Sequence, residues 1–433
     1  MSDPILYEDS EDFARAMDEA DELAPFRERF AIPPSPAHND GRPSLYMCGN
    51  SLGCQPKSVP SEMNKHLDAW ATLGVEGHFH AHEAWYPYHE FVREDMARVV
   101  GAQPREVVAM NTLTVNLHML MTSFYRPTRK RYRILIDTPC FPSDVYAVKS
   151  QARLHGVDPD DAVVMLRPES GQSILDESHI EQAIEEQENR LALVMFAGVN
   201  YFTGQRYDHA RLVKAAHEAG AQIGIDCAHA AGNVELRLHD DGPDFACWCT
   251  YKYLNSGPGA VGGAFVHERH LDREDFDAMP RFEGWWGNDP EDRFRMGEDF
   301  APVRSADAWA LSNPPIFSLV PVRESLKLFA EAGMDRLRMK SERLTGYLAW
   351  LIDRIGGDSF EVITPSEPAR RGCQLSVLVK GEEPRRLLEH LHAEGVVCDF
   401  REPNVVRLAP TPLYNTFDEC RRVAQVLRRF AAS

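Results

Sequence analysis

The stretch AQIGIDCAHAAGNVELRLHDDGPDFACWCTYK (221–252) holds two apolar segments and ends on a single lysine. AQIGIDCA (221–228) and DFACWCTY (244–251) are short, almost continuously apolar runs bounded by turn residues, a pattern typical of buried strands. Asp226 ends the first run and Lys252 directly follows the second. Because neighbouring parallel strands end at the same edge of a sheet, we expect the side chains of Asp226 and Lys252 to project at one edge.

The segments upstream repeat this alternation of strand and helix. The predicted strands are RYRILIDT (131–138), AVVMLRP (162–168) and LALVMFAGV (191–199). Helix-like spacing lies between the strands, at 145–156, 176–190 and 207–220. The alternation predicts an α/β fold with a mostly parallel sheet and helices on both of its faces. Ligands of such sheets bind beyond the carboxyl ends of the strands.

The chain downstream predicts a second, smaller unit. Residues 284–317 are dense in turn residues and lack a period, which indicates a long and therefore functional loop. Two helices and a small α+β unit follow. We therefore expect an N-terminal helical arm at 1–44, a large domain at 45–318 and a small α+β domain at 319–433.

Composition excludes several classes of protein. The formal net charge of −19 would repel phosphate backbones and anionic lipid, so we expect no nucleic-acid or membrane partner. The apolar run 191–199 is far shorter than the roughly 20 residues of a membrane span. The acidic N-terminus resembles neither a secretion signal nor a transit peptide. Nine scattered cysteines predict reduced thiols in the cytoplasm, and for Cys247 and Cys249 packing is favoured over metal ligation, so no metal is expected.

Lys252 has two possible roles. A lysine at a buried sheet edge can form a Schiff base with an aldehyde, or it can extend to solvent. Asp226 favours the first role, because a carboxylate at that edge would pair with the pyridinium nitrogen of a pyridoxal cofactor. The alternative for Asp226 is a helix N-cap.

A phosphate site is predicted at the start of NTLTVNLHMLMTSF (111–124), which has a helical apolar stripe. The amides of Leu113 and Thr114 and a threonine hydroxyl would bind an anion there, although Thr114 could equally be an ordinary cap. FPSDVYAV (141–148) offers Phe141 for stacking on a ring, with Asp144 nearby. GPGAVG (257–262) matches a dinucleotide-binding pattern, but it precedes a strand instead of a helix and is rejected.

Taken together, these segments resemble the kynureninase family, which are pyridoxal 5'-phosphate (PLP) enzymes of fold type I. The resemblance covers nearly the whole chain from about residue 45. Its motifs stand in the family's order: CGNSLG (48–53), NTLTVNLH (111–118), FPSD (141–144), YFTGQ (201–205), DCAHAAGNVELRLHDDGPDFACWCTYKYLN (226–255), GWWG (284–287), SNPPI (312–316) and VVRLAPTPLYN (405–415).

The resemblance implies a role for individual residues. Lys252 would be the Schiff-base lysine, Asp226 the pyridinium partner and Tyr251 a proton shuttle, and these three are the expected catalytic residues. The other residues expected to bind the cofactor are Leu113, Thr114, Phe141, Pro142, Ser143, Asp144, Ala197, His229, Trp285 and Asn313. Trp285 and Asn313 would reach across from a second subunit of a homodimer. Arg407 would bind the substrate α-carboxylate, and His78 and Ser312 its aromatic end.

Three positions qualify the resemblance. Ala197 stands where close relatives often have serine, which removes a hydroxyl from the cofactor site. Trp286 enlarges an aromatic position beside the pocket for the substrate ring. The cluster HFHAH (78–82) has no standard spacing of metal ligands, which favours a solvated turn.

The activity implied by the resemblance is hydrolysis of L-kynurenine or 3-hydroxy-L-kynurenine to anthranilate or 3-hydroxyanthranilate and L-alanine. This reaction belongs to tryptophan catabolism by the kynurenine pathway and to NAD biosynthesis. The alternatives are a cysteine desulfurase or class V aminotransferase on the same fold, and a binding protein that lost catalysis. A desulfurase needs a cysteine on a mobile loop, whereas Cys373 and Cys398 fall in predicted strands.

Overall fold

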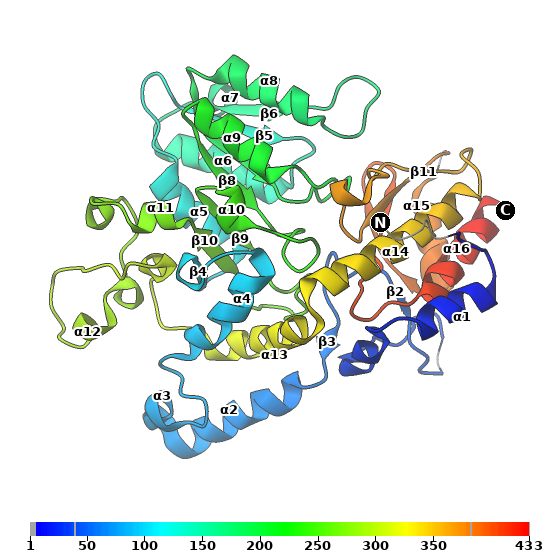
Figure 1. Cartoon of the computed structure of the whole chain (residues 1–433), viewed down its shortest axis with the longest axis horizontal. Coiled ribbons are helices and arrows are strands. Elements are labelled where there is room, and N and C mark those ends of the chain that lie inside the picture. Colours follow the sequence, from blue (N-terminus) through cyan, green and yellow to red (C-terminus); the bar gives the residue numbers. More distant parts are fainter. Residues whose placement is uncertain (1–5, 39, 382, 433) are drawn as a thin grey trace.

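The computed structural model describes residues 6–38, 40–381 and 383–432. Residues 1–5, 39, 382 and 433, which belong to the predicted arm and the predicted small domain, lie outside the described residues. Figure 1 shows a large body built around one sheet, and a smaller body that holds both ends of the described chain. None of the described helices is long and apolar enough to cross a membrane.

The large body contains a seven-stranded sheet in the order β4-β10-β9-β8-β7-β5-β6. Its strands are β4 (Val107–Ala109), β5 (Arg133–Asp137), β6 (Val163–Leu166), β7 (Leu191–Ala197), β8 (Gln222–Asp226), β9 (Phe245–Trp248) and β10 (Gly263–Val266). The pairs from β6 to β9 are parallel, whereas β10 runs antiparallel to both β9 and β4. The predicted mostly parallel sheet is confirmed.

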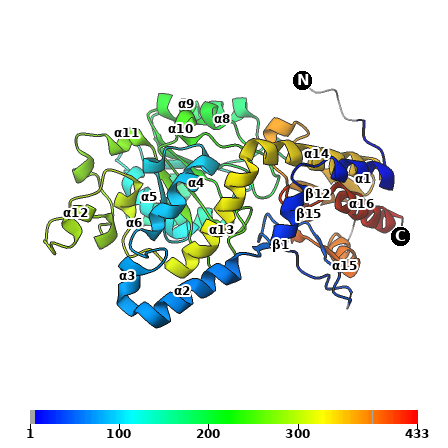
Figure 2. The same ribbon diagram turned by 60° about the horizontal axis from the view of Figure 1, so that its bottom comes forward.

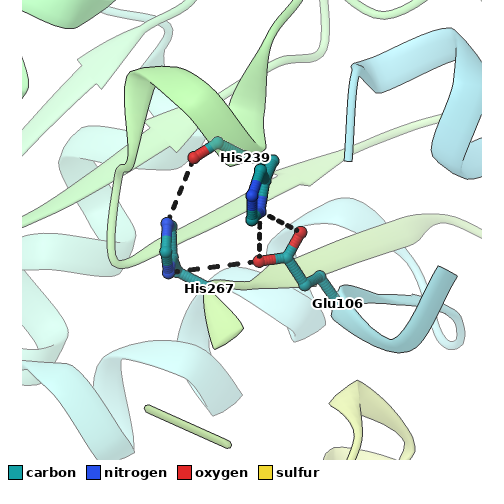
Figure 3. Close-up of side chains that lie close together, drawn as sticks. All are labelled: Glu106, His239 and His267. Carbon is teal, nitrogen blue, oxygen red and sulfur yellow. Dashed lines mark hydrogen bonds and ion pairs between the residues drawn. The ribbon is translucent and has the colours of Figure 1, made fainter. Parts of the chain in front are cut away.

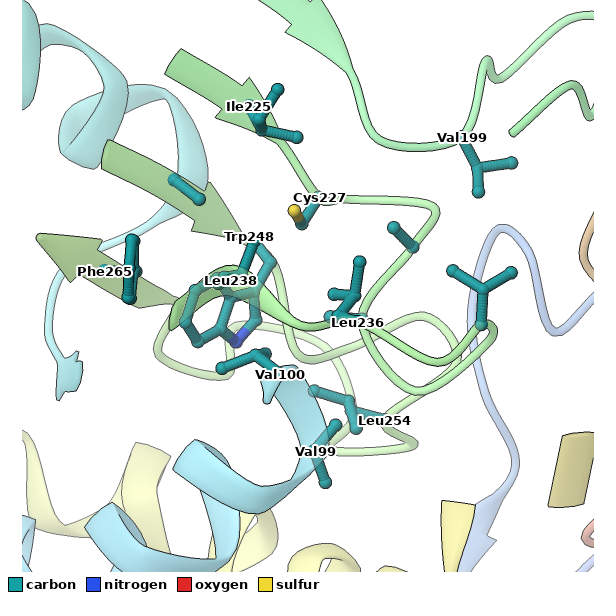
Figure 4. Packing of buried hydrophobic residues seen from close by; sticks show 14 of the residues in the cluster. Val99, Val100, Val199, Ile225, Cys227, Leu236, Leu238, Trp248, Leu254 and Phe265 are labelled. Carbon is teal, nitrogen blue, oxygen red and sulfur yellow. The ribbon is translucent and has the colours of Figure 1, made fainter. Parts of the chain in front are cut away.

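Alternate residues of each strand enter two separate cores, one on each face of the sheet. Ile225, Trp248 and Phe265 pack on one face, and Ile134, Cys247 and Val266 on the other. Figure 4 shows Trp248 between Phe265 and the end of α4 (Arg93–Val100). This two-sided burial explains the continuous apolar runs of the strands. Truncation of the fully buried Trp248 to alanine would cost about 3–5 kcal/mol.

Helices cover both faces of the sheet, as predicted. One face carries α4, α8 (Glu177–Gln187), α9 (His209–Glu218) and α13 (Ile316–Ala332). The other face carries α5 (Leu113–Phe124) and α6 (Pro142–Leu154). The other helices of this body are the long α2 (Val59–Leu73) and the short α3 (Gly77–His80), α7 (Pro159–Ala162), α10 (Leu238–Asp241), α11 (Glu268–Leu271) and α12 (Pro290–Arg293).

The predicted strand at 244–251 is too long at its carboxyl end. β9 ends at Trp248, because its neighbour β8 ends opposite Cys247 and β10 begins opposite Trp248. Residues beyond Trp248 have no strand to pair with, so Cys249 and Tyr251 lie in the following loop rather than on the strand, and Lys252 follows them there. That loop runs through GPGAVG into β10, so the glycines do precede a strand.

The smaller body has an antiparallel sheet in the order β11-β12-β15-β14, which confirms the predicted small α+β unit. Its strands are β11 (Phe360–Val362), β12 (Leu375–Val379), β14 (Asp399–Arg401) and β15 (Val405–Leu408), and its helices are α14 (Met334–Asp353), α15 (Arg385–Ala393) and α16 (Phe417–Ala431). β13 (Val396–Val397) pairs with β2 (Leu45–Tyr46), and β1 (Phe30–Ala31) with β3 (Gln55–Pro56).

The two ends of the described chain meet in the smaller body. α1 (Glu11–Glu19) packs along α16, as Figure 2 shows. The carboxylate of Asp18 accepts hydrogen bonds from the amides of Phe417 (2.6 Å) and Asp418 (3.1 Å), and so caps the start of α16. α13 packs on the large core, whereas α14 packs on the small one. The predicted division at 44/45 and 318/319 stays a prediction.

The predicted loop at 284–317 contains only short helical turns. These are Trp285–Gly287, α12 and Ala306–Trp309. Trp286 anchors the segment, because its indole is buried and packs edge-on against Tyr86 and His89. The segment therefore adds no strand to the sheet.

Candidate active site

A cavity of about 270 Å³ lies beyond the carboxyl ends of β5, β7 and β8 and beside the loop after β9. It is the place that a parallel sheet offers a ligand. Most of the predicted site residues line it: Leu113, Thr114, Phe141, Ser143, Asp144, Ala197, Asp226, His229, Tyr251, Lys252 and Arg407. Strands far apart in the chain thus bring their end residues into one space.

Lys252 enters the cavity between two aromatic rings. Its Nζ lies 5.9 Å from the ring centroid of Phe141 and 5.9 Å from that of Tyr251. Gly53, in the CGNSLG segment, fixes the backbone behind it by donating its amide to the Tyr251 carbonyl at 2.9 Å. A Cβ on Gly53 would stand 2.4 Å from the Lys252 carbonyl oxygen, so only glycine fits there.

Asp226 and Asp144 form a pair of buried carboxyl groups on the same wall. Burial, and then the negative charge of Asp226 with a hydrogen bond between the two, hold the pKa of Asp144 well above its usual range. This environment favours the protonated form of Asp144. Asp226 also accepts from the amide of Ala228 at 2.7 Å, so it caps the local turn as well as facing the cavity.

The N-termini of two helices form the end of the cavity where the phosphate site was predicted. α5 begins at Leu113, and α6 begins directly after Phe141 with Pro142 in its first turn. The hydroxyls of Thr114 and Ser143 lie 2.8 Å apart and join the two helices. Thr114 is therefore not the helix cap, and Pro142 does not line the cavity. Two helix N-termini and two hydroxyls provide donors for one anion.

The opposite end of the cavity belongs to the smaller body. Arg407 on β15 is 1% exposed, and its Nε donates to Asp399 at 2.6 Å. Its Nη1 donates to the carbonyl of Tyr201 at 2.8 Å. With its amide turned so that the oxygen faces the guanidinium, Asn50 accepts from Arg407 at 3.2 Å. Arg407 is thus held in one orientation from both bodies.

His229 and Tyr251 complete the walls in defined protonation states. Burial, and then the charge of Lys252, lower the pKa of His229 well below its usual range, so the imidazole is neutral. Its Nδ1 is buried and has no hydrogen-bond partner among the described residues. Burial raises the pKa of Tyr251, so its hydroxyl keeps its proton.

Besides Pro142, four predicted residues do not line this cavity within one chain. Ser312 and Asn313 line a second cavity of about 330 Å³ beside Trp286. Trp285 is 41% exposed and donates its indole N–H to the Arg293 carbonyl at 3.1 Å. His78 lies in α3, with its ring 5.5 Å from that of Trp85. Their assigned roles stay predictions.

Several lining residues were missed from the sequence. Asp137 ends β5 as Asp226 ends β8, so the rule that singled out Asp226 also points to it. Tyr201 stands directly after the strand-end segment FAGVN, and its ring lies 5.3 Å from that of Phe141. Cys140 precedes Phe141, and Arg401 lies on β14, where no motif marks it. Asn50 and Ser51 belong to CGNSLG and line the cavity.

The residues of the cavity fit PLP. Lys252 offers an amine, and Asp226 offers a carboxylate beside a protonated neighbour. The helix starts at Leu113 and Ser143 offer anion donors, and Phe141 and His229 offer flat faces. Asp144 Oδ1 and His229 Nδ1 are buried polar atoms without a partner among the described residues, which indicates that the wall is built to meet a polar ligand.

A second cluster of titratable side chains lies outside the cavity, where Glu106, His239 and His267 converge (Figure 3). Both nitrogens of His267 are engaged, with the Arg269 amide (3.1 Å) and with the His239 carbonyl (3.1 Å). The two imidazoles stack nearly parallel at 5.5 Å, whereas a shared metal would lie in both ring planes. The cluster joins three chain segments by hydrogen bonds.

Comparison with known proteins adds relatives over the full chain. The kynureninase C-terminal domain family matches residues 337–427. The chain is 52% identical to a kynureninase of Myxococcus xanthus, over 100% of both chains. It is 49% identical to a kynureninase of Koribacter versatilis, over 99% of this chain and 98% of that one.

Solved structures with the same fold are more distant. The cysteine desulfurase CsdA of Escherichia coli superposes with a TM-score of 0.73 at 17% identity, over 94% of this chain and 98% of that one. A C-DES variant with glycine covalently linked to its PLP cofactor superposes with a TM-score of 0.75 at 13% identity, over 93% and 98%. At these identities they establish the fold, which is that of type I PLP enzymes.

Proposed function

The chain belongs to the kynureninase family, and from this premise we propose that it hydrolyses L-kynurenine, or its 3-hydroxy form, to anthranilate or 3-hydroxyanthranilate and L-alanine. The observation that carries the proposal is that Lys252, Asp226 and Arg407 line one cavity. An amine, a carboxylate and a guanidinium in one space match a cofactor aldehyde, a pyridinium and a substrate carboxylate.

The cofactor is PLP. Lys252 would hold its aldehyde and Asp226 its ring nitrogen, while Phe141 and His229 would enclose the ring. Thr114, Ser143 and the first amides of α5 would bind its phosphate. When bound, the cofactor supplies an electron-withdrawing ring that stabilises negative charge on the substrate.

Side chains of the cavity would transfer the protons of the reaction. Lys252 Nζ is the amine that would take the proton from the substrate Cα and return it. The Tyr251 hydroxyl keeps its proton at neutral pH, and its ring lies beside Lys252. This hydroxyl would donate a proton to the substrate Cβ when the Cβ–Cγ bond breaks. The raised pKa of Asp144 favours its protonated form, which would donate toward Asp226, and Asp226 would meet the pyridinium.

Binding energy fixes the bond that breaks. The guanidinium of Arg407 would bind the substrate α-carboxylate, which leaves the Cβ–Cγ bond next to the ketone to be cleaved by one water molecule. His78, Ser312 and Trp286 are the residues that would meet the aromatic ring of the substrate, and they would set the preference for kynurenine or its 3-hydroxy form.

We place the active site at the interface of a homodimer. Trp285 and Asn313 do not reach the cavity of their own chain, so their predicted cofactor contacts require a second one. Large apolar side chains are exposed on α2, on α3 and in the segment after β10, as a covered surface requires. They are Trp70, Val75, Phe79, Phe282, Trp285 and Phe294.

The pathway and the compartment follow from the chemistry. The substrate and products place the reaction in tryptophan catabolism by the kynurenine pathway, and hydrolysis of the 3-hydroxy substrate would feed NAD biosynthesis. All nine cysteines are free thiols, and most are buried, which suits the reducing cytoplasm.

Desulfuration is the second candidate function, because solved desulfurases share the fold. A desulfurase needs a reactive thiolate. Burial raises the pKa of the Cys373 thiol to about 12 and holds that of the Cys398 thiol well above its usual range, and neither residue lines the cavity. Cys140 does line it, but burial and three nearby carboxylates raise its pKa as well. A binding protein without catalysis would not need the full set of Lys252, Asp226 and Arg407.

The test is direct. Purified protein loaded with PLP is incubated with kynurenine, with 3-hydroxykynurenine and with cysteine, and anthranilate fluorescence, alanine and sulfide are measured. We expect equal amounts of alanine and the aromatic acid from at least one kynurenine, and no sulfide. Release of sulfide without anthranilate would replace the proposal with desulfuration.

A further inference from the structure

Two arginines of the cavity share a single carboxylate. Arg401 and Arg407 both line the cavity, and the carboxylate between them is that of Asp399. Asp399 and Arg401 are two residues apart on β14, so their side chains lie on one face of the strand. Arg407 stands directly opposite Asp399 on β15. Two positive charges and one negative charge leave this cluster with a net charge of +1.

Arg407 has few donors left for a substrate. Its Nε and Nη2 donate to the two oxygens of Asp399, and its Nη1 donates to the Tyr201 carbonyl. Its side chain is only 1% exposed. Asp399 therefore orients and neutralises Arg407 at the same time, and the pair by itself attracts an anion weakly.

Arg401 is the cation with free donors. Its Nη2 donates to Asp399 at 3.1 Å, while its Nε is buried and has no hydrogen-bond partner among the described residues. Its side chain is 34% exposed. Burial, and then the positive charge of Arg407, lower the pKa of Arg401, as expected for a guanidinium that lacks a second anion.

We infer that Arg401 is a second substrate-binding residue, and that its guanidinium, together with the free edge of Arg407, binds the α-carboxylate of the amino-acid substrate. The inference rests on the proposed function, and it assigns the uncompensated charge of the carboxylate subsite to Arg401. The substrate carboxylate makes the cluster neutral, as a desolvated site requires.

The charge distribution of the cavity supports this orientation. Asp137 and Asp226 line it at strand ends and Asp144 in the first turn of α6, whereas both arginines come from the small sheet. An α-amino acid carries its amine and its carboxylate on one carbon. It would align with this field by directing the amine toward Lys252 and the carboxylate toward the arginines.

The test compares Arg401→Gln and Arg401→Lys with Arg385→Gln, all as PLP-loaded protein. Arg385 is a matched control, because it is an arginine near β14 that pairs with Glu402 on the surface, outside the cavity. Three measurements are made: KM and kcat for kynurenine, inhibition by 4-(2-aminophenyl)-4-oxobutanoate, and binding of kynuramine. The second compound lacks the α-amine, and the third lacks the carboxylate.

For Arg401→Gln we expect KM and the inhibition constant of the carboxylate compound to rise about 10- to 100-fold, the loss typical of a charge-assisted hydrogen bond. The value of kcat and the affinity for kynuramine should stay within about threefold of the wild type, because neither depends on the carboxylate contact. Arg401→Lys keeps the positive charge but loses the planar guanidinium that can make two parallel hydrogen bonds. Its KM and inhibition constant should therefore lie between those of Arg401→Gln and the wild type. Arg385→Gln should match the wild type.

Equal loss of affinity for all three compounds, or no loss for any, would overturn the inference. If Arg401→Gln does not fold, as judged by its melting curve, Arg401→Lys decides: an unchanged KM and inhibition constant would overturn it. Titration with L-alanine, followed by the visible absorption of the cofactor, separates the two proposals. A wild type that does not cleave kynurenine refutes the proposed function, whereas weaker alanine binding by Arg401→Gln still supports the carboxylate subsite.

Discussion

Asp144, in the first turn of α6, and Asp226, at the end of β8, lie together on one wall of the cavity. Burial, and then the charge of Asp226, raise the pKa of Asp144 well above its usual range, which favours the proton on Asp144. The Ala228 amide donates to Asp226 at 2.7 Å and fixes the position of its carboxyl group. A pyridinium needs one anion at a defined place, and this pair provides it.

The pair predicts an asymmetry between two isosteric substitutions. Asp226→Asn removes the charge and should lower kcat by about 10²–10³-fold, the effect of losing one electrostatic contact in a catalytic site. Asp144→Asn replaces a neutral acid with a neutral amide that can still donate to Asp226, and should lower kcat less than about tenfold. Steady-state kinetics on both variants with saturating PLP would check this. Equal losses of kcat would mean that Asp144 and Asp226 share the contact with the pyridinium, and a larger loss for Asp144→Asn would mean that their roles are reversed.

Lys252→Ala tests the assignment of the amine. We expect turnover of kynurenine to fall at least about 10³-fold, since the variant loses both the cofactor attachment and the base. Borohydride reduction of the wild-type holoenzyme, followed by peptide mass spectrometry, should find the pyridoxyl group on Lys252. A label on another lysine, or native turnover by the variant, would contradict the assignment.

Asp137 predicts a dependence of stability on pH. Burial raises the pKa of Asp137 to about 6, while the Asn200 amide donates to it at 2.8 Å. A raised pKa favours the protonated form in the fold, so this stability is present at pH 4 and is lost as the pH rises through 6. The difference in unfolding free energy between Asp137→Asn and the wild type should therefore change by about 2–3 kcal/mol in favour of the variant as the pH rises from 4 to 7.

The measurement for Asp137 is urea unfolding of the protein without cofactor at several pH values. The control is Asp358→Asn, which changes an exposed carboxylate. A difference between Asp137→Asn and the wild type that does not change with pH would refute the shifted pKa.

Asp244 predicts the opposite pH dependence. Although its burial alone would raise the pKa of Asp244, hydrogen bonds from His217 (3.1 Å) and His270 (2.8 Å) lower it below its usual range. The stability it contributes is present above pH 4 and is lost as the pH falls. Asp244→Asn should destabilise the protein by about 3–5 kcal/mol at pH 7, because the buried partners lose their anion. Thermal unfolding at pH 7 and pH 3 should show a smaller difference between Asp244→Asn and the wild type at pH 3.

Mixed dimers test whether two chains share each active site. Lys252→Ala and Trp285→Ala chains are each expected to form defective dimers. If Trp285 serves the partner's cavity, a hybrid has one site with both defects and one intact site, so random reassociation should restore about a quarter of the native activity. Mixtures that stay as inactive as the separate variants would place Trp285 in the site of its own chain.

The sheet and much of its site could be predicted, because both depend on local patterns. Apolar runs at 191–199 and 221–228 marked buried strands, and polar residues at their ends marked the edge. The end of β9 could not be predicted from its apolar run, because it depends on where β8 and β10 stop.

Arg401 was missed for a different reason. An arginine on a short edge strand is usually a solvated side chain, and only the docking of β14 against the cavity makes it part of the site. The predicted cofactor contacts of Trp285 and Asn313 cross between two chains, so the structure of one chain cannot test them.

The contact between α1 and α16 has a consequence during synthesis. Asp18 and Phe417 are 399 residues apart, so at about 5–20 residues per second the ribosome exposes the first roughly 20–80 seconds before the second. Phe13 packs on Tyr347 of α14, so Phe13, Ala14 and Met17 lack their apolar surface until α14 emerges and complete it only with α16. The nascent arm is therefore the segment that we expect a chaperone to hold, and the small body can become native only after translation is nearly over.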